Sequence, residues 1–399
     1  MNRIVVVGGS LAGVSAIDEL RRRGYDGELT LVGAEPGLPY DRPPLSKAAL
    51  TRLVEGEEPD DLLLRPAAWY DDRDVTLRLG VPAAGLDVAG REVLLASGDT
   101  VSYDGLVVAT GSILRPSSIV DQLPSVHQLR TSSDAHGLAA ALRAGGHLVV
   151  VGAGFVGMEV AATAVALGVT VTVVDIAPVP MSRAFGPALG SWFRRRHEDH
   201  GVRVLCPSGI ARTEEVGRRT VFDLAGGERI VADAVLVGIG TVPAIGWLED
   251  SGLALGDGIL CAPDLTTSAP GVVAAGDVVR WDHSLFGESL RIEHWTNAVE
   301  QGGHAAATLL GEPAAFDAVP MFWTDQYDAR VRCLGRLSPA DDVAVLTETE
   351  RSVVAVTSRA GVVRGAVCIN APRRLAAMRA AIAEQRQVED LLSAAPAAS

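Results

Sequence analysis

The sequence predicts an α/β protein in which two parallel-sheet units share one plan and a smaller α+β domain follows them. Two stretches each place an apolar strand, a glycine-rich turn, a helix and a second strand in that order, and their first glycines, Gly8 and Gly152, are 144 residues apart. Beyond about residue 316 the pattern changes to strand-like runs before one long amphipathic helix from about Pro372, and residues 395–399 should form a frayed tail. Residues 202–205, 220–224 and 229–231 are rich in alternating β-formers and predict an antiparallel extension. A chain of 399 residues is also long enough for two or three domains.

The first stretch opens with a strand over residues 3–7 and continues in a helix to about residue 23, which Gly24 ends. A second strand covers 28–32, and Glu35 comes after it. The turn between the first strand and the helix contains Gly8, Gly9, Ser10, Leu11, Ala12 and Gly13. Serine stands at the middle position of this turn, where the usual pattern has a third glycine, but serine is small enough for a close approach.

The second stretch repeats the plan with a strand over 147–151, a helix to about 167 and a strand over 169–174. Asp175 follows the last strand directly. Its turn contains Gly152, Ala153, Gly154, Phe155, Val156 and Gly157. Strands buried on both faces of a parallel sheet are continuous apolar runs, so we interpret 4–16 and 148–174 as sheet and helix rather than as a leader or a membrane span.

A glycine turn at a helix start lets the backbone approach a pyrophosphate, and an acid after the next strand takes the ribose hydroxyls. Two copies, each with an acid in place, therefore predict two Rossmann-like domains that bind two different dinucleotides. The natural pair is a tightly bound FAD and a transient NADH, because hydride passes between the two rings. Asp175 would repel the 2′-phosphate of NADPH, and no arginine follows it until Arg183, so we expect NADH.

The composition of the chain further narrows the functions and partners that it could have. The net charge of −14 disfavours nucleic-acid backbones as partners. The four cysteines, which are scattered and have no metal-ligand spacing, predict reduced thiols in a cytoplasmic protein that holds no metal: Cys206, Cys261, Cys333 and Cys368. Among 35 basic residues only Lys47 is a lysine, so any chemistry that needs an ammonium group falls there.

Several short motifs carry a resemblance to a known family. The segment Pro39-Tyr40-Asp41-Arg42-Pro43-Pro44-Leu45-Ser46-Lys47 is followed in order by Thr110-Gly111, Leu129-Arg130-Thr131, Gly276-Asp277, Glu293-His294-Trp295 and residues 320–327, Pro-Met-Phe-Trp-Thr-Asp-Gln-Tyr. In this combination the chain resembles the FAD-dependent NADH:ferredoxin reductases of bacterial oxygenase systems, the putidaredoxin reductase and biphenyl dioxygenase reductase type. Ser10, Ala244, Met321 and Thr324 depart from the family pattern.

The resemblance implies a discontinuous FAD-binding domain at 1–115 and 245–315, an NAD-binding domain at 116–244 and a C-terminal α+β domain at 316–399. It implies that FAD contacts these residues: Gly8, Ser10, Leu11, Ala12, Gly13, Glu35, Arg42, Lys47, Val81, Ala109, Thr110, Gly111, Arg130, Gly276, Asp277, Glu293, His294, Trp295, Ala298 and Trp323. For NADH it implies these: Gly152, Gly154, Phe155, Val156, Gly157, Glu159, Asp175, Arg183, Gly238 and Gly240.

Three residues are candidates for catalysis: Lys47, Glu159 and Trp323. Glu159 is the only charge between residues 148 and 174, and a buried carboxylate needs a partner. By resemblance it pairs with Lys47 beside the flavin, where we expect the pair to set the electrostatics of hydride arrival. Trp295 and Trp323 would pack beside the flavin ring, or else serve as core aromatics, and His294 is equally compatible with a site or a core position.

Residues 36–50 contain no cysteine, whereas disulfide reductases of the same superfamily carry a redox cysteine there. Electrons should therefore leave the flavin singly for the cluster of a partner, an iron–sulfur ferredoxin. Arg291, Arg330, Arg332 and Arg336 would form a basic dock for it, or else belong to a mixed solvated surface. We expect a monomer or weak homodimer, with no membrane or nucleic-acid partner.

Other functions remain compatible with the sequence. A rubredoxin reductase or a flavin-dependent NADH oxidase would use the same two dinucleotide sites. In a different class, an NADH-sensing interaction protein resembling apoptosis-inducing factor would share the architecture and the lysine–glutamate pair, although this chain lacks room for that protein's insertion in the last domain. These classes differ in the electron acceptor that each would use, so a comparison of acceptors distinguishes them.

Overall fold

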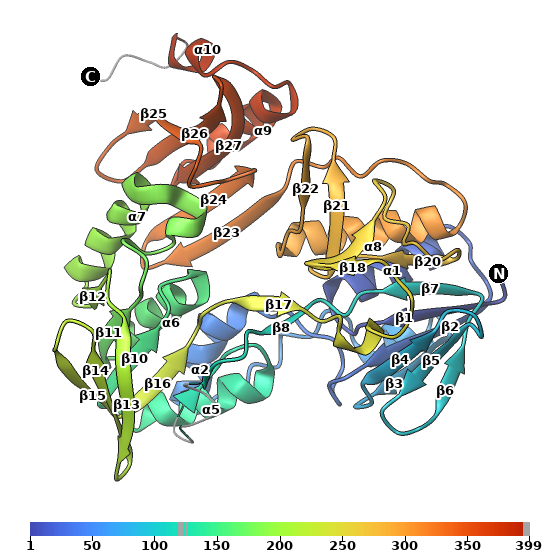
Figure 1. The fold of residues 1–399 in the computed structure, drawn as a ribbon, viewed down its shortest axis with the longest axis horizontal. Helices are drawn as coiled ribbons and strands as arrows, with labels where there is room; N and C mark the ends of the chain where they lie inside the picture. Colours follow the sequence, from blue (N-terminus) through green and yellow to red (C-terminus); the bar gives the residue numbers. More distant parts are fainter. Residues whose placement is uncertain (119–122, 124–125, 394–399) are drawn as a thin grey trace. The chain divides into compact units, whose positions relative to one another are not determined.

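The computed structural model describes residues 1–118, 123 and 126–393, so the frayed tail predicted at Ala395 to Ser399 lies outside the described residues. The chain divides into two compact units, each assembled from three separate stretches (Figure 1). Unit 1 comprises Met1–Asp41, Asp61–Ile113 and Val242–Phe322. Unit 2 comprises Arg42–Asp60, Leu114–Thr241 and Trp323–Ser399.

Unit 1 is organised around a parallel five-stranded sheet with the order β20-β7-β1-β2-β3. The central strand β1 (Arg3–Val7) is buried at four of its five positions because neighbours hydrogen-bond to it on both sides and helices cover the faces. The other strands of this sheet are β2 (Glu28–Gly33), β3 (Val75–Leu79), β7 (Gly105–Val108) and β20 (Val272–Ala274).

The helices of unit 1 include α1 (Leu11–Arg22) and α8 (Trp295–Leu309), which pack closely against each other. Gly302 of α8 makes this approach possible, because a Cβ there would lie 2.3 Å from the carbonyl oxygen of Ala12. Gly24, with φ +83°, ends α1 as the sequence predicts. The two remaining short helices are α3 (Ala67–Asp71) and the 3₁₀ turn η2 (Gly246–Leu248).

Two smaller sheets complete unit 1. The antiparallel sheet β4-β5-β6 contains β4 (Ala83–Asp87), β5 (Glu92–Leu95) and β6 (Thr100–Ser102). The sheet β18-β19-β21-β22 contains β18 (Leu255–Gly256), β19 (Gly258–Cys261), β21 (Val279–His283) and β22 (Glu288–Leu290). The short strands β8 (Ser112–Leu114) and β17 (Thr241–Pro243) pair with each other where the chain passes between units.

Unit 2 repeats the parallel plan with the order β12-β11-β10-β16-β9. Its strands are β9 (Val126–His127), β10 (His147–Val151), β11 (Thr170–Val174), β12 (Arg203–Leu205) and β16 (Ala234–Val237). Its helices are η1 (Pro43–Ser46), α2 (Ala48–Glu55), α5 (Ser132–Arg143), α6 (Phe155–Ala166) and α7 (Ser182–Asp199). A capping box between Thr131 and Asp134 starts α5.

Two details of unit 2 correct the sequence prediction. We expected residues 202–205 to belong to an antiparallel extension, but β12 pairs in parallel with β11, because the connection through α7 returns the chain to the same edge of the sheet. The antiparallel extension instead consists of β13 (Ile210–Val216), β14 (Arg219–Leu224) and β15 (Arg229–Ala232). The sequence prediction missed β13, whose alternation is obscured by exposed charged side chains.

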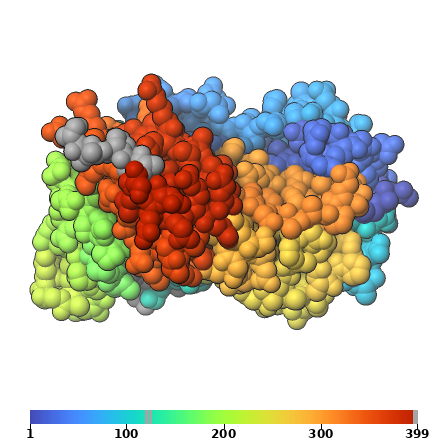
Figure 2. Space-filling view, turned by 90° about the horizontal axis from the view of Figure 1, so that it is seen from above, coloured from blue at the N-terminus to red at the C-terminus, as the bar shows by residue number. Residues whose placement is uncertain are grey.

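The C-terminal part of unit 2 forms an antiparallel sheet with the order β23-β24-β27-β26-β25, so this region has the expected α+β composition. In Figure 2 the described residues of this region, drawn in orange-red to red, lie together on the face shown. The strands are β23 (Met321–Gln326), β24 (Ala329–Gly335), β25 (Asp342–Glu348), β26 (Val353–Arg359) and β27 (Val362–Ile369).

The predicted single helix from Pro372 is wrong in detail. The segment contains η3 (Pro372–Arg374), α9 (Leu375–Ala383) and α10 (Val388–Ser393). The break falls at Gln385, whose φ of 51° is left-handed and ends α9, and Gln387 then bridges to Val362 of β27. In the part of the chain that the structure describes, no helix is long and apolar enough to cross a membrane.

Candidate functional site

The structure sorts the predicted site residues into two groups, one in each unit. Unit 1 holds Gly8, Ser10, Leu11, Ala12, Gly13, Glu35, Val81, Ala109, Thr110, Gly111, Gly276, Asp277, Glu293, His294, Trp295 and Ala298. Unit 2 holds Arg42, Lys47, Arg130, Gly152, Gly154, Phe155, Val156, Gly157, Glu159, Asp175, Arg183, Gly238, Gly240 and Trp323. Each unit contains one of the two glycine turns, and four residues that the resemblance assigned to FAD belong to unit 2: Arg42, Lys47, Arg130 and Trp323.

The turn of unit 1 is a close-packed backbone cradle between β1 and α1. Gly8 has φ +127°, and a Cβ on it would lie 2.0 Å from the carbonyl oxygen of Ala109. A Cβ on Gly13 would lie 2.0 Å from the oxygen of Gly8. Ser10 precedes α1 in extended conformation and its side chain caps nothing, so no side chain competes for the first-turn amides of the helix. This arrangement suits an anionic group at the helix start.

Asp277 is fixed in the same unit by its neighbours. The Ser112 hydroxyl donates to its carboxylate at 2.9 Å, and the guanidinium of Arg291 donates to its backbone oxygen at 3.2 Å. The amide of Gly276, a residue with φ +83°, donates to the side-chain oxygen of Gln301 at 2.9 Å. The sequence analysis missed Ser112 and Gln301, since a polar residue on an apolar helix such as α8 gives no signal of its partner.

The remaining predicted residues of unit 1 are held by side chains of the Pro39–Lys47 segment and by strand ends. The Tyr40 hydroxyl donates to the Glu35 carboxylate at 2.6 Å. The Trp295 indole donates to the Asp41 carboxylate at 2.8 Å, which fixes the ring at the start of α8. The His294 ring lies against the Phe322 ring, with the two centroids 4.5 Å apart. The motif therefore orients the residues that the sequence assigned to the flavin.

The turn of unit 2 reproduces the cradle between β10 and α6. Gly152 has φ +106°, and its Cβ would lie 2.3 Å from the oxygen of Gly238, while a Cβ on Gly157 would lie 2.3 Å from the oxygen of Gly152. The middle glycine differs, because a Cβ on Gly154 would meet nothing nearer than 3.9 Å. Gly154 begins α6 and no side chain caps the helix. The packing would therefore allow a side chain at this middle position, and the space there is open only because the residue is a glycine.

Asp175 binds the glycine turn itself. One carboxylate oxygen accepts the amide of Ala153 at 2.6 Å, and the other accepts the amide of Ala177 at 2.7 Å. The carboxylate thereby fixes the edge of the turn as well as lying where a ribose would be recognised. Arg183 lies in the first turn of α7 and is exposed.

Lys47 and Glu159 form an ion pair inside unit 2, as the sequence analysis expected. The Lys47 ammonium lies 2.6 Å from the nearer Glu159 oxygen, Oε2, and also donates to the backbone oxygen of Pro43 at 3.0 Å. The Glu159 side chain is 7 % exposed and the Lys47 side chain 22 %, so the pair is largely shielded from solvent. Charge-assisted bonds at such short distances are among the strong ones.

Two hydroxyl groups also donate hydrogen bonds to the Glu159 carboxylate. Ser46 donates to Glu159 Oε2 at 2.6 Å and Thr324 donates to Glu159 Oε1 at 2.7 Å. Thr163, one turn beyond Glu159 on α6, donates to the backbone oxygen of Ser46 at 2.8 Å and so ties η1 to α6. The sequence analysis missed Ser46 and treated Thr324 only as a departure from the family pattern. A usable signal was present, since Thr324 and Gln326 are polar residues at alternate positions of one strand.

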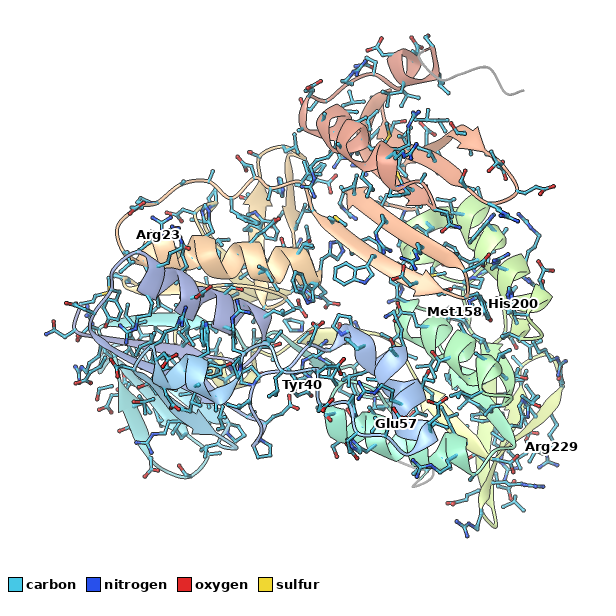
Figure 3. The ribbon with its side chains drawn as sticks, turned by 180° about the vertical axis from the view of Figure 1, so that it is seen from behind. Arg23, Tyr40, Glu57, Met158, His200 and Arg229 are labelled. Carbon is cyan, nitrogen blue, oxygen red and sulfur yellow. The ribbon has the colours of Figure 1, made fainter. Side chains whose placement is uncertain are left out.

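Trp323 and the arginines of the predicted site come from distant parts of the sequence and differ in setting. Trp323 is half-exposed and precedes the buried Thr324 on β23. Arg42 donates from its guanidinium to the backbone oxygen of Arg130 at 2.7 Å, which links the two predicted arginines directly. In Figure 3 the labels Met158 and His200 mark α6 and the residue after α7, the helices that carry Glu159 and His197.

The residues suggested as a basic dock are partly neutralised. Arg332 pairs with Asp325 at 2.6 Å, and Arg291 pairs with Asp257 at 3.1 Å and with Glu293. Arg330 is exposed. The ion pairs favour the mixed solvated surface over a dedicated basic patch.

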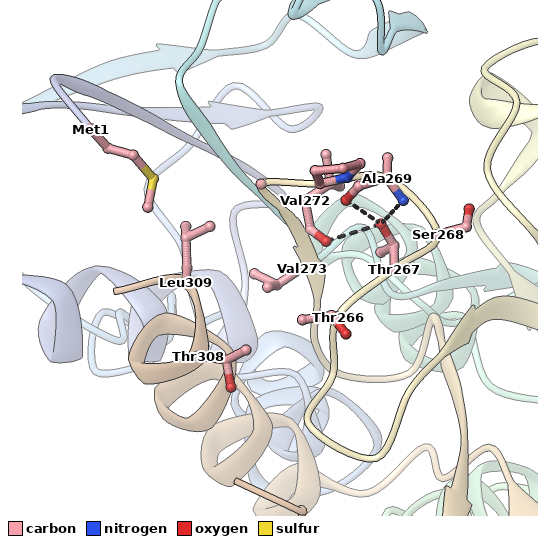
Figure 4. Close-up of a pocket in the computed structure, with 11 residues that line it drawn as sticks. Met1, Thr266, Thr267, Ser268, Ala269, Val272, Val273, Thr308 and Leu309 are labelled. Atoms are coloured by element: carbon pink, nitrogen blue, oxygen red, sulfur yellow. Dashed lines mark hydrogen bonds between the residues drawn. The ribbon is translucent and has the colours of Figure 1, made fainter. Parts of the chain in front are cut away.

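A pocket of about 370 Å³ in unit 1 is separate from these groups (Figure 4). It is lined by Met1, the segment 266–273, Thr308 and Leu309. The Thr267 hydroxyl that faces it already donates to the backbone oxygen of Val272 at 2.9 Å. None of the predicted site residues lines it. Among the residues the structure describes, no group of three or more His, Cys, Asp or Glu side chains could hold a metal ion.

Comparison with known proteins identifies the family. Residues 2–302 match the pyridine nucleotide-disulphide oxidoreductase family, and residues 321–399 match a reductase C-terminal domain. The chain belongs to the pyridine nucleotide-disulphide oxidoreductase family. These matches confirm the family resemblance drawn from the motifs. They also confirm the predicted fold of two Rossmann-like domains followed by an α+β domain.

Curated members of this family match the chain along almost its whole length. Rhodocoxin reductase of Rhodococcus erythropolis is 36 % identical over 385 residues, which cover 96 % of this chain and 90 % of that protein. The ferredoxin–NAD(+) reductase component of the biphenyl dioxygenase system of Paraburkholderia xenovorans is 34 % identical, with 99 % and 100 % covered. The structure of a covalent putidaredoxin reductase–putidaredoxin complex has a TM-score of 0.91 and 29 % identity, covering 100 % and 99 %.

Proposed function

We propose that this chain is an NADH-dependent ferredoxin reductase that holds FAD tightly and supplies electrons to an oxygenase. The observation that carries the proposal is nearly full-length agreement with relatives that are named as ferredoxin–NAD(+) reductase components of dioxygenases. Both glycine turns of the structure support it, since each has an uncapped helix start and a backbone cradle that side chains would fill. The residues present therefore fit two dinucleotides.

In unit 1, Gly8, Gly13 and the start of α1 would hold the pyrophosphate of FAD, and Asp277 would hold its ribityl chain. FAD supplies the capacity to take a hydride as a pair of electrons and release the electrons singly. Trp295, fixed by Asp41, would bound the ring with an aromatic face. The close packing of Gly8 against Ala109 makes the cradle rigid before any ligand arrives, which lowers the ordering cost of binding.

In unit 2, the start of α6 would hold NADH, with Asp175 at the ribose. The carboxylate is anchored at both oxygens by backbone amides, so it cannot swing aside to admit a 2′-phosphate. This supports NADH over NADPH. The test is a comparison of the rates of flavin reduction by the two nucleotides, and equal efficiency with NADPH would contradict it.

Lys47 and Glu159 would set the electrostatics at the nicotinamide end of the site. The Lys47 side chain is the more exposed partner of the pair and the Glu159 side chain is buried, so we expect a ligand to meet the lysine first. We expect Lys47→Met and Glu159→Ala to slow flavin reduction by NADH in stopped flow by about tenfold or more, as removal of one positioned electrostatic group typically does. Unchanged rates in both variants would contradict this role.

The electron acceptor is tested with a panel. Purified protein with NADH is offered ferredoxins, rubredoxin, O₂ and cytochrome c separately. Fast turnover that requires a ferredoxin supports the proposal, whereas fast turnover with rubredoxin alone or O₂ alone indicates a rubredoxin reductase or an oxidase. A long-lived complex with NADH and little turnover indicates a sensor. The lack of cysteine in residues 36–50 supports transfer without a protein disulfide, and the scattered thiols support a cytoplasmic location.

A further inference from the structure

The Lys47–Glu159 pair is one end of a longer chain of hydrogen bonds inside unit 2. From Glu159 Oε1 the chain runs to the Thr324 hydroxyl at 2.7 Å and on to the Gln326 amide nitrogen at 3.0 Å. The Gln326 carbonyl oxygen lies 2.8 Å from His197 Nε2, and His197 Nδ1 lies 3.0 Å from the Tyr327 hydroxyl. Thr324, Gln326 and His197 are each at most 2 % exposed. Water does not reach these three links.

With the Gln326 amide in the orientation that the structure has, the chemistry of the groups gives this chain of hydrogen bonds one direction. An amide nitrogen only donates, so Thr324 accepts from Gln326 and gives its own proton to Glu159. The Gln326 carbonyl only accepts, so His197 Nε2 must carry a proton. Burial lowers the pKa of His197 to about 4, so the ring is neutral at pH 7. Nδ1 therefore accepts from the Tyr327 hydroxyl.

The opposite polarity is also possible for these atoms, and it would disconnect Glu159. If the Gln326 amide turned over, its oxygen would face Thr324 and compete for the threonine proton. His197 would then carry its proton on Nδ1 and donate to Tyr327. The orientation of the Gln326 amide, and with it the ring nitrogen of His197 that carries the proton, thus decides whether Glu159 Oε1, three hydrogen bonds away from His197, receives a hydrogen bond.

The far end of the chain is fixed to α7. Tyr327 lies in the turn between β23 and β24 with φ 57°, a left-handed conformation that is uncommon for a tyrosine. Its ring stacks on His200 with centroids 3.7 Å apart, and the next residue, Asp328, forms an ion pair with Arg196 of α7. These contacts hold the Tyr327 hydroxyl against His197.

We propose that Thr324, Gln326, His197 and Tyr327 form a positioning relay that orients the Glu159 carboxylate, and through it Lys47, for hydride transfer. The four are positioning residues, because they act through Glu159. This proposal rests on the proposed function, because the relay sets the geometry of the Lys47–Glu159 pair that the proposed function uses. It joins three stretches of the chain: η1, the α6–α7 region and the β23–β24 hairpin.

The first test uses matched substitutions at the link nearest to Glu159. Thr324→Val removes the hydroxyl with almost no change in shape, and Thr324→Ser keeps it. Because a hydrogen bond to a charged group is a strong one, we expect flavin reduction by NADH to slow about tenfold in Thr324→Val and less than about twofold in Thr324→Ser. Tyr327→Phe, at the far end, should slow it about threefold. Equal rates in Thr324→Val and wild type would overturn the proposal.

A double-mutant cycle separates positioning from stability. In a Glu159→Ala background the relay has nothing to orient, so Thr324→Val and Tyr327→Phe should no longer change the hydride-transfer rate. A purely structural role would lower the melting temperature and the rate in both backgrounds. If Glu159→Ala alone leaves the rate unchanged, the proposed role of the pair fails. If Glu159→Ala slows transfer and the relay variants do not, only the relay fails.

The second test does not depend on turnover. Nitrogen NMR of ¹⁵N-histidine-labelled protein, assigned with His197→Gln, reports which ring nitrogen carries the proton. We expect wild type at pH 7 to carry it on Nε2 alone, and Gln326→Leu to allow a mixture of both tautomers because the acceptor at Nε2 is lost. A proton on Nδ1 in wild type would reverse the direction of the chain and refute the relay.

Discussion

The two glycine turns have the same backbone plan but differ at the middle position. Gly8 and Gly152 both have positive φ, and a side chain on either would collide with the carbonyl oxygen of a neighbouring strand end, Ala109 or Gly238. The middle residue is Ser10 in unit 1 and Gly154 in unit 2, and neither has a positive φ. A Cβ at Gly154 would contact only the oxygen of Gly238 at 3.9 Å.

The comparison separates two reasons for a glycine. The first glycine of each turn is required by the fold, because the backbone conformation and the neighbouring carbonyl exclude a side chain. The middle position is not required by the fold, since serine occupies it in unit 1 without strain. The substitutions below test whether the glycine at the middle of the unit 2 turn serves a ligand that approaches the backbone.

The largest expected effect is at the first glycine. Gly152→Ala should destabilise the protein by roughly 4 kcal/mol, from the positive φ together with the 2.3 Å approach to Gly238. Gly168→Ala is the matched control, because Gly168 has φ +80° but no atom within 4 Å of its Cβ, and it should cost only about 1 kcal/mol. Thermal or urea unfolding followed by circular dichroism measures both. Equal losses would mean that the carbonyl contact contributes nothing.

The second effect compares the two buried histidines. Burial lowers the pKa of His283 in unit 1, and it lowers the pKa of His197 in unit 2 to about 4. The pKa of His197 in the folded protein lies below the unfolded value of about 6.5. Its contribution to the free energy of unfolding, on the order of 3 kcal/mol, is therefore complete above pH 6.5 and is lost as the pH falls toward 4. His197→Gln should flatten the pH dependence of unfolding between pH 6.5 and 4.

His283→Gln is the control for that experiment. The groups that face the His197 ring are Tyr327, Gln326 and His200. None of them supplies a negative charge that would hold a proton on the ring. If His197→Gln leaves the acid slope unchanged while His283→Gln removes it, the acid-sensitive histidine is the one in unit 1 and the comparison is reversed.

The third effect concerns the acids that follow the turns. Asp175 accepts two backbone amides, whereas Glu35 accepts the Tyr40 hydroxyl. An asparagine has one acceptor atom in place of two, so Asp175→Asn should leave one amide unpaired and cost about 2 kcal/mol. Glu35→Gln should cost less than about 1 kcal/mol, because the amide oxygen can still accept from Tyr40. Chemical unfolding of the two variants in parallel gives the difference, and a larger loss for Glu35→Gln would be contrary to it.

The smallest effect on stability, and the most informative on function, is at the middle position. Gly154→Ala should change the free energy of unfolding by less than about 0.5 kcal/mol, because φ is −78° and the nearest contact is ordinary. It should weaken NADH binding about tenfold if the ligand approaches the backbone there. Ser10→Gly in unit 1 should leave NADH binding unchanged. Titration of NADH followed by absorbance distinguishes the two positions, and unaltered affinity in Gly154→Ala would place the ligand elsewhere.

The periodic and local features of the chain were predictable from the sequence. Both glycine turns, the strands β1, β10, β16 and β24, and the acids after β2 and β11 follow from apolar runs and glycine positions. The split of the Pro372 helix was not predictable from periodicity, because a left-handed residue at Gln385 and a bridge to β27 end it. The parallel pairing of β12 likewise depends on a partner strand far away in sequence.

The sequence by itself determined that two glycine-rich turns exist, and it singled out Lys47 as the one lysine and Glu159 as the one charge in an apolar stretch, while the family resemblance implied that the two residues pair. Only the tertiary structure decided what surrounds the pair. Thr324, Gln326, His197 and Tyr327 come from β23, its turn and α7, and no local pattern connects them. The reason is that a hydrogen bond depends on the direction and distance between two atoms, which the chain sets only when its distant segments pack together.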